Sequence, residues 1–323
     1  MVKMAILGAG TIAHKMAFTI QSMPSVEAYA VAARDEQRAK SFAACYGFTK
    51  ANGSYEQMLA DDAVELVYVA VPHSLHFKYM KLCLEAGKHV LCEKPFTVDA
   101  AQAKMILDLA KEKQLLVAEA MWTRYMPSRK IIDDIINSGA IGEVTSLTAN
   151  IGYELSSVQR IWDVNLAGGA LLDVGCYLIH FAKMVLGDEI TNIQASSVFK
   201  NGVDAIDTIS LTFHNTNLAS MQCSVTAALN RHGNIFGTKG YIEITNINNP
   251  ELIEVFDATY QRTATYKIPE QITGFEYEVE ACVEAMTQGL IECEAMPHSE
   301  IVSVMAVMDK IRQDWGYELP QVT

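Results

Sequence analysis

The chain opens with a glycine-rich turn between an apolar strand and a helix, and this feature constrains its fold most. Val2–Leu7 predicts a short buried strand, Gly8-Ala-Gly10-Thr-Ile-Ala13 follows, and a helical pattern continues to Ile20. Gly8 makes the tight turn, Gly10 lets backbone approach a pyrophosphate, and Ala13 lets the helix pack closely on the strand. Because the helix N-terminus faces the phosphates, the order of elements predicts a dinucleotide site. Its predicted contacts at this turn are Gly8, Gly10, Thr11 and Ile12.

The second strand indicates which dinucleotide binds. Val26–Ala32 reads as a buried strand, and Arg34 follows at its tip with Arg38 one helical turn later. Two guanidinium groups on one helix face fit a 2′-phosphate through charge-assisted hydrogen bonds. We therefore predict NADP, with NAD as the alternative, because the adjacent Asp35 could serve a ribose hydroxyl.

Strand and helix patterns alternate up to about residue 120, which predicts a doubly wound parallel sheet. In such sheets ligands bind at the carboxyl ends of the strands. Two groups of residues that include polar side chains are expected at these ends. The first group, Pro72, His73 and His76, follows the strand at 64–71, and no third ligand nearby completes a metal site. The second group, Glu93 and Lys94, ends the strand that starts near Lys88 and stops at Pro95. We expect cofactor contacts from all five residues and no metal, with a helix-cap role as the alternative for His73 and His76.

The remaining sequence is rich in strands. Runs at 144–153, 190–199, 206–213, 218–227, 234–236, 241–245 and 252–256 predict a large, open, mostly antiparallel sheet, with helices at 173–186, 275–289 and 299–315. We expect an α/β protein with an N-terminal Rossmann domain at 1–120 and a C-terminal α/β domain at 121–323 that contains this sheet.

Composition excludes several classes of protein. The net charge of −13 disfavours nucleic acid and anionic membranes as partners. No apolar run approaches the roughly 20 residues of a membrane span, so we expect no transmembrane segment. Seven scattered cysteines without a Cys-x-x-Cys pair predict reduced thiols, and with the lack of a signal peptide they predict a cytoplasmic protein.

A second informative stretch runs from Gly168 to His180. Two glycines lead into a helix, and Asp173, Tyr177 and His180 fall at i, i+4 and i+7 among apolar neighbours. Such a polar stripe is either exposed to water or gathered into a site. With a cofactor domain already predicted, we favour a site.

These motifs together resemble a known family. Gly8-x-Gly10-x-x-Ala13, Glu93-Lys94-Pro95, the Trp122-Thr-Arg124 segment and Gly168–Tyr177 are similar to the Gfo/Idh/MocA oxidoreductases, within them the dimeric dihydrodiol dehydrogenase and D-xylose 1-dehydrogenase branch. The resemblance implies a cis Lys94-Pro95 bond that aims the lysine inward. It also implies that the domain at 121–323 binds the substrate and forms a homodimer or higher oligomer through its sheet. It implies catalytic roles for Lys94, Asp173 and Tyr177. Weaker substrate or cofactor candidates are Trp122, Arg124, Arg160, Trp162 and His180. Tyr177 stands where many members have histidine.

The expected reaction moves hydride between nicotinamide and a hydroxyl or carbonyl carbon of a cyclic polyhydroxylated substrate, such as an aldopyranose or a trans-dihydrodiol. Tyr177 would be the base in oxidation and the acid in reduction, since the Lys94 cation favours the phenolate. Lys94 itself is the alternative base, and Asp173 would orient one or both groups. Two other functions remain open, a non-catalytic NADP(H) sensor and a reductase of small carbonyl or dicarbonyl compounds.

Overall fold

The computed structural model describes residues 1–214 and 217–320, and the backbone forms two compact units. Unit 1 contains Met1–Tyr125 and Gln271–Met305, and unit 2 contains Met126–Glu270 and Ala306–Thr323. The units therefore differ from the linear division at residue 120, because the chain returns to unit 1 after residue 270. There the Val117 amide donates to the Ile291 carbonyl at 3.0 Å, which ties the returning segment to the edge of the first sheet.

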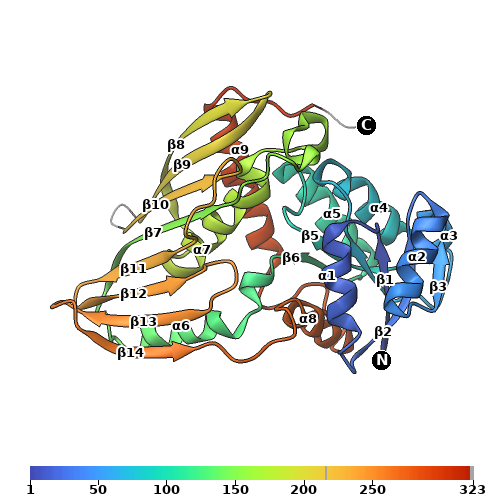
Figure 1. Ribbon diagram of the computed structural model, residues 1–323, viewed down its shortest axis with the longest axis horizontal. Coiled ribbons are helices and arrows are strands. Elements are labelled where there is room, and N and C mark those ends of the chain that lie inside the picture. Colours follow the sequence, from blue (N-terminus) through green and yellow to red (C-terminus); the bar gives the residue numbers. More distant parts are fainter. Residues whose placement is uncertain (215–216, 321–323) are drawn as a thin grey trace. The chain divides into compact units, whose positions relative to one another are not determined.

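Unit 1 contains a six-stranded parallel sheet in the order β3-β2-β1-β4-β5-β6 (Figure 1). Its strands are β1 (Val2–Leu7), β2 (Val26–Ala32), β3 (Lys50–Asn52), β4 (Leu66–Val69), β5 (His89–Glu93) and β6 (Val117–Ala120). Its helices are α1 (Thr11–Ile20), α2 (Glu36–Tyr46), α3 (Tyr55–Leu59), α4 (His76–Glu85), α5 (Ala100–Lys113), α8 (Glu276–Thr287) and the first part of α9 (His298–Asp314). The predicted doubly wound sheet is confirmed. The strand order reverses at β1, which lies between β2 and β4.

Short polar side chains start several of these helices. Asp35 accepts from the Arg38 amide at 2.9 Å, Ser54 accepts from the Gln57 amide, and Asp99 accepts from the Gln102 amide. Each bond satisfies an amide that the first helical turn leaves without a partner.

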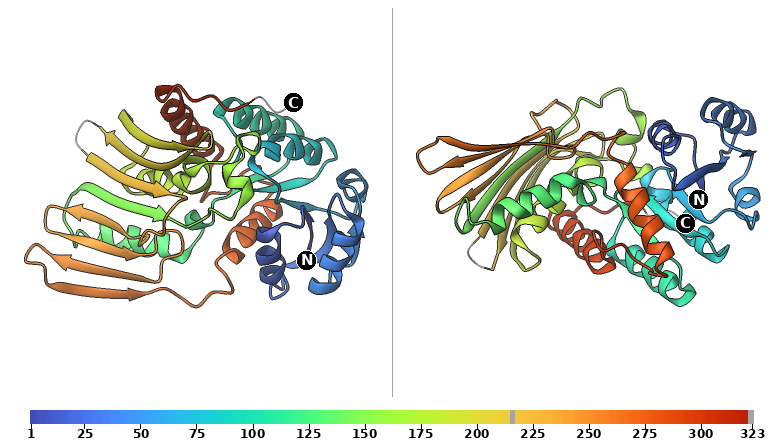
Figure 2. Two further views of the ribbon diagram at one scale, coloured as in Figure 1. Left: turned by 45° about the horizontal axis from the view of Figure 1, so that its top comes forward. Right: turned by 90° about the horizontal axis from the view of Figure 1, so that it is seen from below.

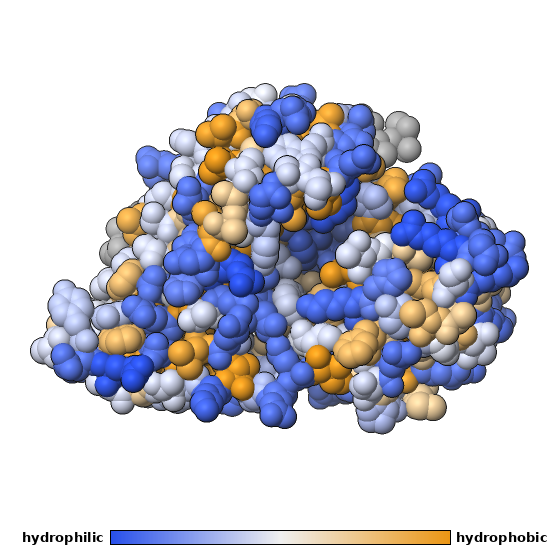
Figure 3. Space-filling view, in the orientation of Figure 1, coloured by the Kyte–Doolittle hydropathy of each residue, from blue (hydrophilic) through white to orange (hydrophobic). Residues whose placement is uncertain are grey.

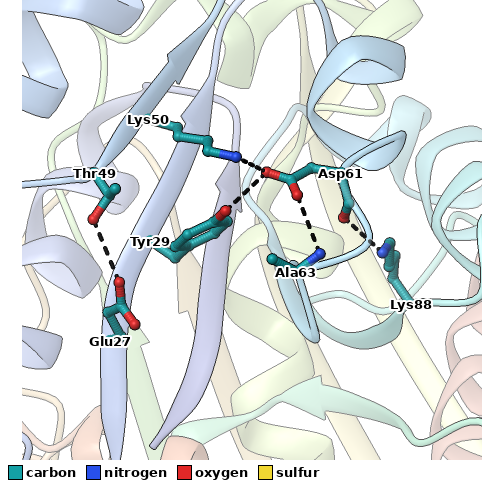
Figure 4. A network of polar contacts seen from close by, with 7 residues as sticks. All are labelled: Glu27, Tyr29, Thr49, Lys50, Asp61, Ala63 and Lys88. Atoms are coloured by element: carbon teal, nitrogen blue, oxygen red, sulfur yellow. Dashed lines mark hydrogen bonds and ion pairs between the residues drawn. The ribbon is translucent and has the colours of Figure 1, made fainter.

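The amino ends of the strands in unit 1 carry a network of charges that satisfy one another (Figure 4). The Asp61 carboxylate accepts from the Lys50 ammonium at 2.5 Å, the Tyr29 hydroxyl at 3.0 Å and the Ala63 amide at 3.1 Å. The hydrogen bond from Lys50, then the one from the Ala63 amide, lowers the pKa of Asp61 to about 2. Lys88 donates to the Asp61 carbonyl at 2.8 Å. This end of the sheet is held by its own side chains.

Unit 2 contains an eight-stranded, mostly antiparallel sheet in the order β14-β13-β12-β11-β7-β10-β9-β8. The strands are β7 (Val144–Gly152), β8 (Ile190–Lys200), β9 (Val203–Phe213), β10 (Asn217–Ser224), β11 (Gly233–Gly237), β12 (Gly240–Thr245), β13 (Leu252–Asp257) and β14 (Arg262–Lys267). The expected large sheet is confirmed. The sequence analysis missed β14, because its residues are mostly exposed and show no apolar alternation.

Helices of unit 2 lie on one side of this sheet. In the right view of Figure 2, α6 (Pro127–Asn137) and α7 (Cys176–Leu186) are on the same side of the strands. Leu147, Ile209 and Met221 are buried, whereas Thr148 and Ser220 are exposed. This alternation is typical of a sheet with one covered and one open face.

One segment is long and apolar enough to cross a membrane, contrary to the expectation from the sequence. It runs from Val164 to Leu186 and includes the predicted helix at 173–186. Its polar residues, such as Asp173 and His180, obscured its length in the printed sequence. Because 83% of its most apolar window is buried inside the protein, it has the character of a core helix.

Exposed hydrophobic residues are dispersed on the visible face of the molecule, where hydrophilic residues predominate (Figure 3). Single exposed apolar side chains of this kind are normal for a globular protein and do not by themselves mark a binding surface.

Candidate functional site

The first part of the candidate site is the turn after β1 at the carboxyl edge of the parallel sheet. Gly8 has φ +106°, and a Cβ there would lie 2.4 Å from the Ala70 carbonyl oxygen. Only glycine has access to this backbone conformation without a clash. The turn therefore lies close against the end of β4, at the point where the strand order reverses and ligands bind in folds of this kind.

The start of α1 fits an anionic ligand. Gly10 is its N-cap residue, and no described side chain accepts a hydrogen bond from the amides of its first turn. The positive end of the helix dipole and these amides suit a pyrophosphate. Thr11 is exposed and Ile12 half-buried beside them, so the predicted contacts Gly8, Gly10, Thr11 and Ile12 form one continuous turn.

Two arginines follow β2. Arg34 and Arg38 are both exposed, and Arg38 donates to the Ala9 carbonyl at 2.6 Å, which places its guanidinium beside the glycine turn. Asp35 caps α2 through the Arg38 amide. The carboxylate next to the arginines thus has a structural role, and the positive charges of this strand tip face the solvent.

Both histidines that follow β4 are buried. His76 is fully buried, and its two ring nitrogens lie 2.8 Å from the Pro95 carbonyl and 2.9 Å from the Val71 carbonyl. Burial, then the neighbouring His73, lowers the pKa of His76 to about 3. His76 therefore joins two loops at the carboxyl edge, while Pro72 is half-buried and His73 is 6% exposed.

The Glu93-Lys94-Pro95 segment ends β5 beside these loops. The Lys94-Pro95 bond is cis, as the resemblance implied. The Tyr68 hydroxyl, from the end of β4, donates to the Glu93 carboxylate, and the Lys94 amide donates to the same carboxylate at 3.2 Å. Glu93 is thus fixed within unit 1, whereas the Lys94 side chain is partly exposed.

Unit 1 also holds buried acids that the sequence analysis missed. Glu278 on α8 is fully buried, and its two carboxyl oxygens have no hydrogen-bond partner among the described residues. Burial, then the charge of Glu93, raises the pKa of Glu278 well above its usual range, and Lys15 opposes this. Burial also raises the pKa of Glu119 to about 8. The signal for Glu278 was its place on the apolar stripe of α8, with Val279 and Cys282.

Trp122 and Arg124, two of the weaker substrate candidates, are anchored inside unit 1. Trp122 packs edge-on against Phe275 with ring centroids 4.8 Å apart. Arg124 donates to the Glu300 carboxylate at 2.8 Å and to the Ala295 carbonyl at 2.9 Å. These contacts hold the returning segment 271–305 in unit 1.

In unit 2, the glycines before the proposed catalytic helix make room for the protein itself. A Cβ on Gly168 would lie 2.2 Å from the Ile161 carbonyl oxygen. Gly169 has φ +110°, and its Cβ would lie 2.2 Å from a carboxylate oxygen of Asp204. Within unit 2, the neighbours that these glycines approach are this backbone and this acid.

The helix begins with a π-helical turn, Leu171–Gly175, which continues as α7. A π-turn holds one more residue than an α-turn and is often found at functional sites. Asp173 lies in it, 4% exposed, and accepts from Arg160 at 3.0 Å. Tyr177 is half-buried and His180 fully buried. The three polar residues therefore differ in burial and do not form one exposed stripe.

Arg160 and Trp162 precede the glycines. The contact with Asp173 brings Arg160 to the predicted catalytic position, and 43% of its side chain remains exposed. The Trp162 indole donates to the Leu155 carbonyl at 3.0 Å. Of these two candidates, only Arg160 contacts a residue of the predicted catalytic set.

Comparisons with known proteins agree with both units. Residues 2–121 match the oxidoreductase family with an NAD-binding Rossmann fold, and residues 130–243 match the GFO/IDH/MocA C-terminal domain. The chain is 31% identical to the trans-1,2-dihydrobenzene-1,2-diol dehydrogenase of Xenopus tropicalis, and the match covers 98% of this chain and 99% of the relative. It is 32% identical to the enzyme of the same name from Homo sapiens, with 98% of this chain and 97% of the relative covered.

Solved structures share the fold. A 3-ketoreductase from Actinomadura kijaniata with NADP and TDP-benzene has a TM-score of 0.89 at 24% identity, covering 97% of both chains. An aldose-aldose oxidoreductase from Caulobacter crescentus with glycerol has a TM-score of 0.87 at 20% identity, covering 97% of this chain and 96% of the other. The full-length likeness to the dehydrogenases and the two matched domains show that the chain belongs to the Gfo/Idh/MocA family of NAD(P)-binding oxidoreductases.

Proposed function

We propose that the protein is an NADP-dependent dehydrogenase or reductase acting on a CH–OH or carbonyl carbon of a cyclic polyhydroxylated compound, a trans-dihydrodiol or an aldopyranose such as D-xylose. One observation carries the proposal: relatives named trans-1,2-dihydrobenzene-1,2-diol dehydrogenase match 98% of the chain at 31–32% identity. The chain contains Lys94, Asp173 and Tyr177, the catalytic residues that the resemblance implies, and their presence favours an enzyme over a non-catalytic sensor.

The preference for NADP rests on the tip of β2. Arg34 and Arg38 are exposed, and Arg38 lies beside the glycine turn through its bond to Ala9. Two guanidiniums suit a 2′-phosphate. Asp35, which would favour NAD if it bound a ribose hydroxyl, is occupied as the cap of α2. A structural relative was solved with NADP, which supports the same choice.

The nicotinamide ring, when bound, accepts or supplies the hydride. Tyr177 takes the hydroxyl proton in oxidation and returns it in reduction. Lys94 holds the reacting oxygen and favours the phenolate, because a nearby cation lowers a phenol pKa. Asp173, fixed by Arg160, orients the polar groups around the oxygen. A positioned acid–base group of this kind contributes on the order of 10²–10⁴-fold to the rate.

The first test is binding of NADP⁺ and NAD⁺ side by side, followed by turnover with trans-dihydrodiols, aldoses and polyols. Tighter NADP⁺ binding with turnover of one class supports the proposal and identifies the substrate. Binding without any turnover favours the sensor. Turnover only of small carbonyl or dicarbonyl compounds with NADPH favours the second alternative, a reductase using the same residues.

Two further expectations remain proposals. The open face of the eight-stranded sheet is the proposed surface of a homodimer or higher oligomer, because an uncovered sheet face and edge invite pairing. A cytoplasmic location is consistent with the seven cysteines, which are free thiols in the structure. Light scattering and localisation of a tagged protein test these two proposals.

A further inference from the structure

A buried pair of carboxyl groups lies beneath the π-turn that begins the Asp173–Tyr177 helix. Asp204 is 3% exposed and Asp207 is fully buried, both on β9. The strand pairing brings them together: Val198 pairs with Ile206 and Phe199 with Asp204, so the ladder skips one residue of β9. This irregularity breaks the usual alternation, and residues three apart both become buried.

Asp204 contacts the beginning of the helix. Its carboxylate accepts from the Leu171 amide at 2.5 Å, and the Ala170 amide also hydrogen-bonds to it. Gly169 lies so close that a Cβ there would clash with the same carboxylate. No described side chain next to this turn caps its first amides. Asp204 on β9, which is distant in sequence, therefore serves as the cap.

Asp207 lies near Asp204, whose charge contributes to the raised pKa of Asp207, and its Oδ1 oxygen has no hydrogen-bond partner among the described residues. Two neighbouring buried carboxyl groups cannot both stay ionised, so one of them is protonated. Asp204 already accepts backbone amides, which favours its charged form. The proton therefore belongs on Asp207. The Cys223 thiol donates to the Oδ2 oxygen of Asp207 at 3.3 Å.

We propose that Asp204 is a positioning residue for the helix that carries Asp173 and Tyr177, and that protonated Asp207 maintains this cap. The proposal rests on the proposed function for its link to turnover. When Asp207 loses its proton, two adjacent carboxylates repel each other, and the hold on the Leu171 amide weakens. The enzyme then loses activity on the alkaline side through this pair rather than through Tyr177.

The other titratable groups around the pair are few. Cys223 on β10 contacts Asp207, and Cys176 on α7 faces Cys223. The charge of Asp204 raises the pKa of Tyr317, and the charge of Arg312 on α9 lowers it. Burial, then the Asp204 charge, raises the pKa of Asp207 to about 8, whereas burial raises the pKa of Tyr317 to about 12. Asp207 is therefore the group that changes charge first as the solution becomes alkaline.

The sign of the effect follows from the raised pKa of Asp207, which is 3.8 in the unfolded chain. The stabilisation from protonated Asp207 is complete below the unfolded value and is lost as the pH rises toward about 8. Asn at this position keeps the shape and an N–H donor but cannot ionise.

The activity test compares pH profiles of kcat for the parent, Asp207→Asn, Asp204→Ala and Asp204→Asn. Thr208→Ala, on the same strand with an exposed side chain, is the matched control. We expect the alkaline loss of the parent to move upward by about one pH unit or more in Asp207→Asn. Asp204→Ala should lower kcat roughly 10–100-fold with little change in the KM for NADP⁺, and Asp204→Asn should recover part of it. An unchanged alkaline limb in Asp207→Asn, or full kcat in Asp204→Ala, overturns the proposal.

A second measurement needs neither turnover nor a variant that folds. Hydrogen exchange at the Leu171 amide of the parent, corrected for the intrinsic rate, should lose protection as the pH passes about 8. Constant protection from pH 6 to pH 9 overturns the cap, whether or not the proposed dehydrogenase activity is found. Lost protection without any turnover keeps the cap and rejects the proposed function.

Discussion

The two helix starts linked to the proposed chemistry use the same backbone feature in opposite ways. α1 begins at Gly10 with no described side chain bonded to its first amides, at the exposed edge of the parallel sheet. The helix with Asp173 and Tyr177 begins in the interior of unit 2, where the Asp204 carboxylate accepts from the Leu171 amide. Both starts follow a glycine with positive φ that approaches its neighbour closely, Gly8 in one case and Gly169 in the other.

The difference indicates a division of labour. A helix start that leaves its amides open suits a ligand anion, which then completes the turn. A start whose amides are satisfied by a buried carboxylate has nothing to offer a ligand, but its side chains are held in place. We therefore expect changes at α1 to alter cofactor binding, and changes at the second helix to alter turnover.

Tyr177→Phe should give the largest effect. Removing the hydroxyl removes the proposed acid–base group, so kcat should fall roughly 10²–10⁴-fold while the affinity for NADP⁺ stays unchanged. Steady-state kinetics and a binding titration on one preparation check both parts. Turnover close to that of the parent would remove Tyr177 from the mechanism and move the role of base to Lys94.

Gly8→Ala should weaken cofactor binding at the turn before α1. The new Cβ would lie 2.4 Å from the Ala70 carbonyl oxygen at φ +106°, a strain of roughly 1–3 kcal/mol, and NADP⁺ affinity should fall about tenfold or more. Gly47→Ala is the matched control, with φ +70° and no described atom within 4 Å of the added Cβ. Equal losses of affinity in both variants would contradict a special role for the turn.

Arg34→Ala tests the selectivity for NADP⁺ over NAD⁺ at the carboxyl edge of the parallel sheet, where α1 begins. A lost charge-assisted bond is worth about 1.5–3 kcal/mol, so NADP⁺ binding should weaken by roughly 10–100-fold while NAD⁺ binding barely changes. Arg38→Ala should add to this effect and also loosen the turn, because it breaks the bond to the Ala9 carbonyl. Equal weakening of both dinucleotides would mean that the arginines do not read the 2′-phosphate.

Asp61→Asn should give the smallest effect, a modest loss of stability without loss of cofactor binding, since Asp61 lies at the amino end of the sheet. Its pKa of about 2 is below the ordinary 3.8, so its stabilisation is present above pH 4 and is lost as the pH falls through about 2. Denaturant unfolding of parent and variant should differ at pH 7 and converge near pH 2. A change in NADP⁺ affinity would show that the two ends of the sheet are coupled.

Much of the fold follows from the sequence because local patterns agree with the tertiary structure. The strand Val2–Leu7, the glycine turn and the run of buried strands to β6 form as predicted. The return of 271–305 to unit 1 could not be predicted, because its packing depends on contacts such as Arg124 with Glu300, 176 residues away.

The candidate site was only partly predictable. The motif residues could be read from their spacing, and the cis Lys94-Pro95 bond from the resemblance. The burial of Asp204 could not be predicted, because it depends on a skipped residue in the pairing of β8 with β9. The burial of Asp207 could have been predicted, because its position alternates with those of the apolar residues Ile209 and Leu211 on the buried face of β9. A carboxyl on an apolar stripe identifies both Asp207 and Glu278.

The most direct test measures NADP⁺ binding and turnover together in Gly8→Ala and Asp204→Ala. We predict that Gly8→Ala loses NADP⁺ affinity, and that Asp204→Ala binds NADP⁺ like the parent but turns over roughly 10–100-fold more slowly. The opposite pattern, or equal loss of binding in both variants, would contradict the conclusion that one helix start binds the cofactor and the other positions the catalytic side chains.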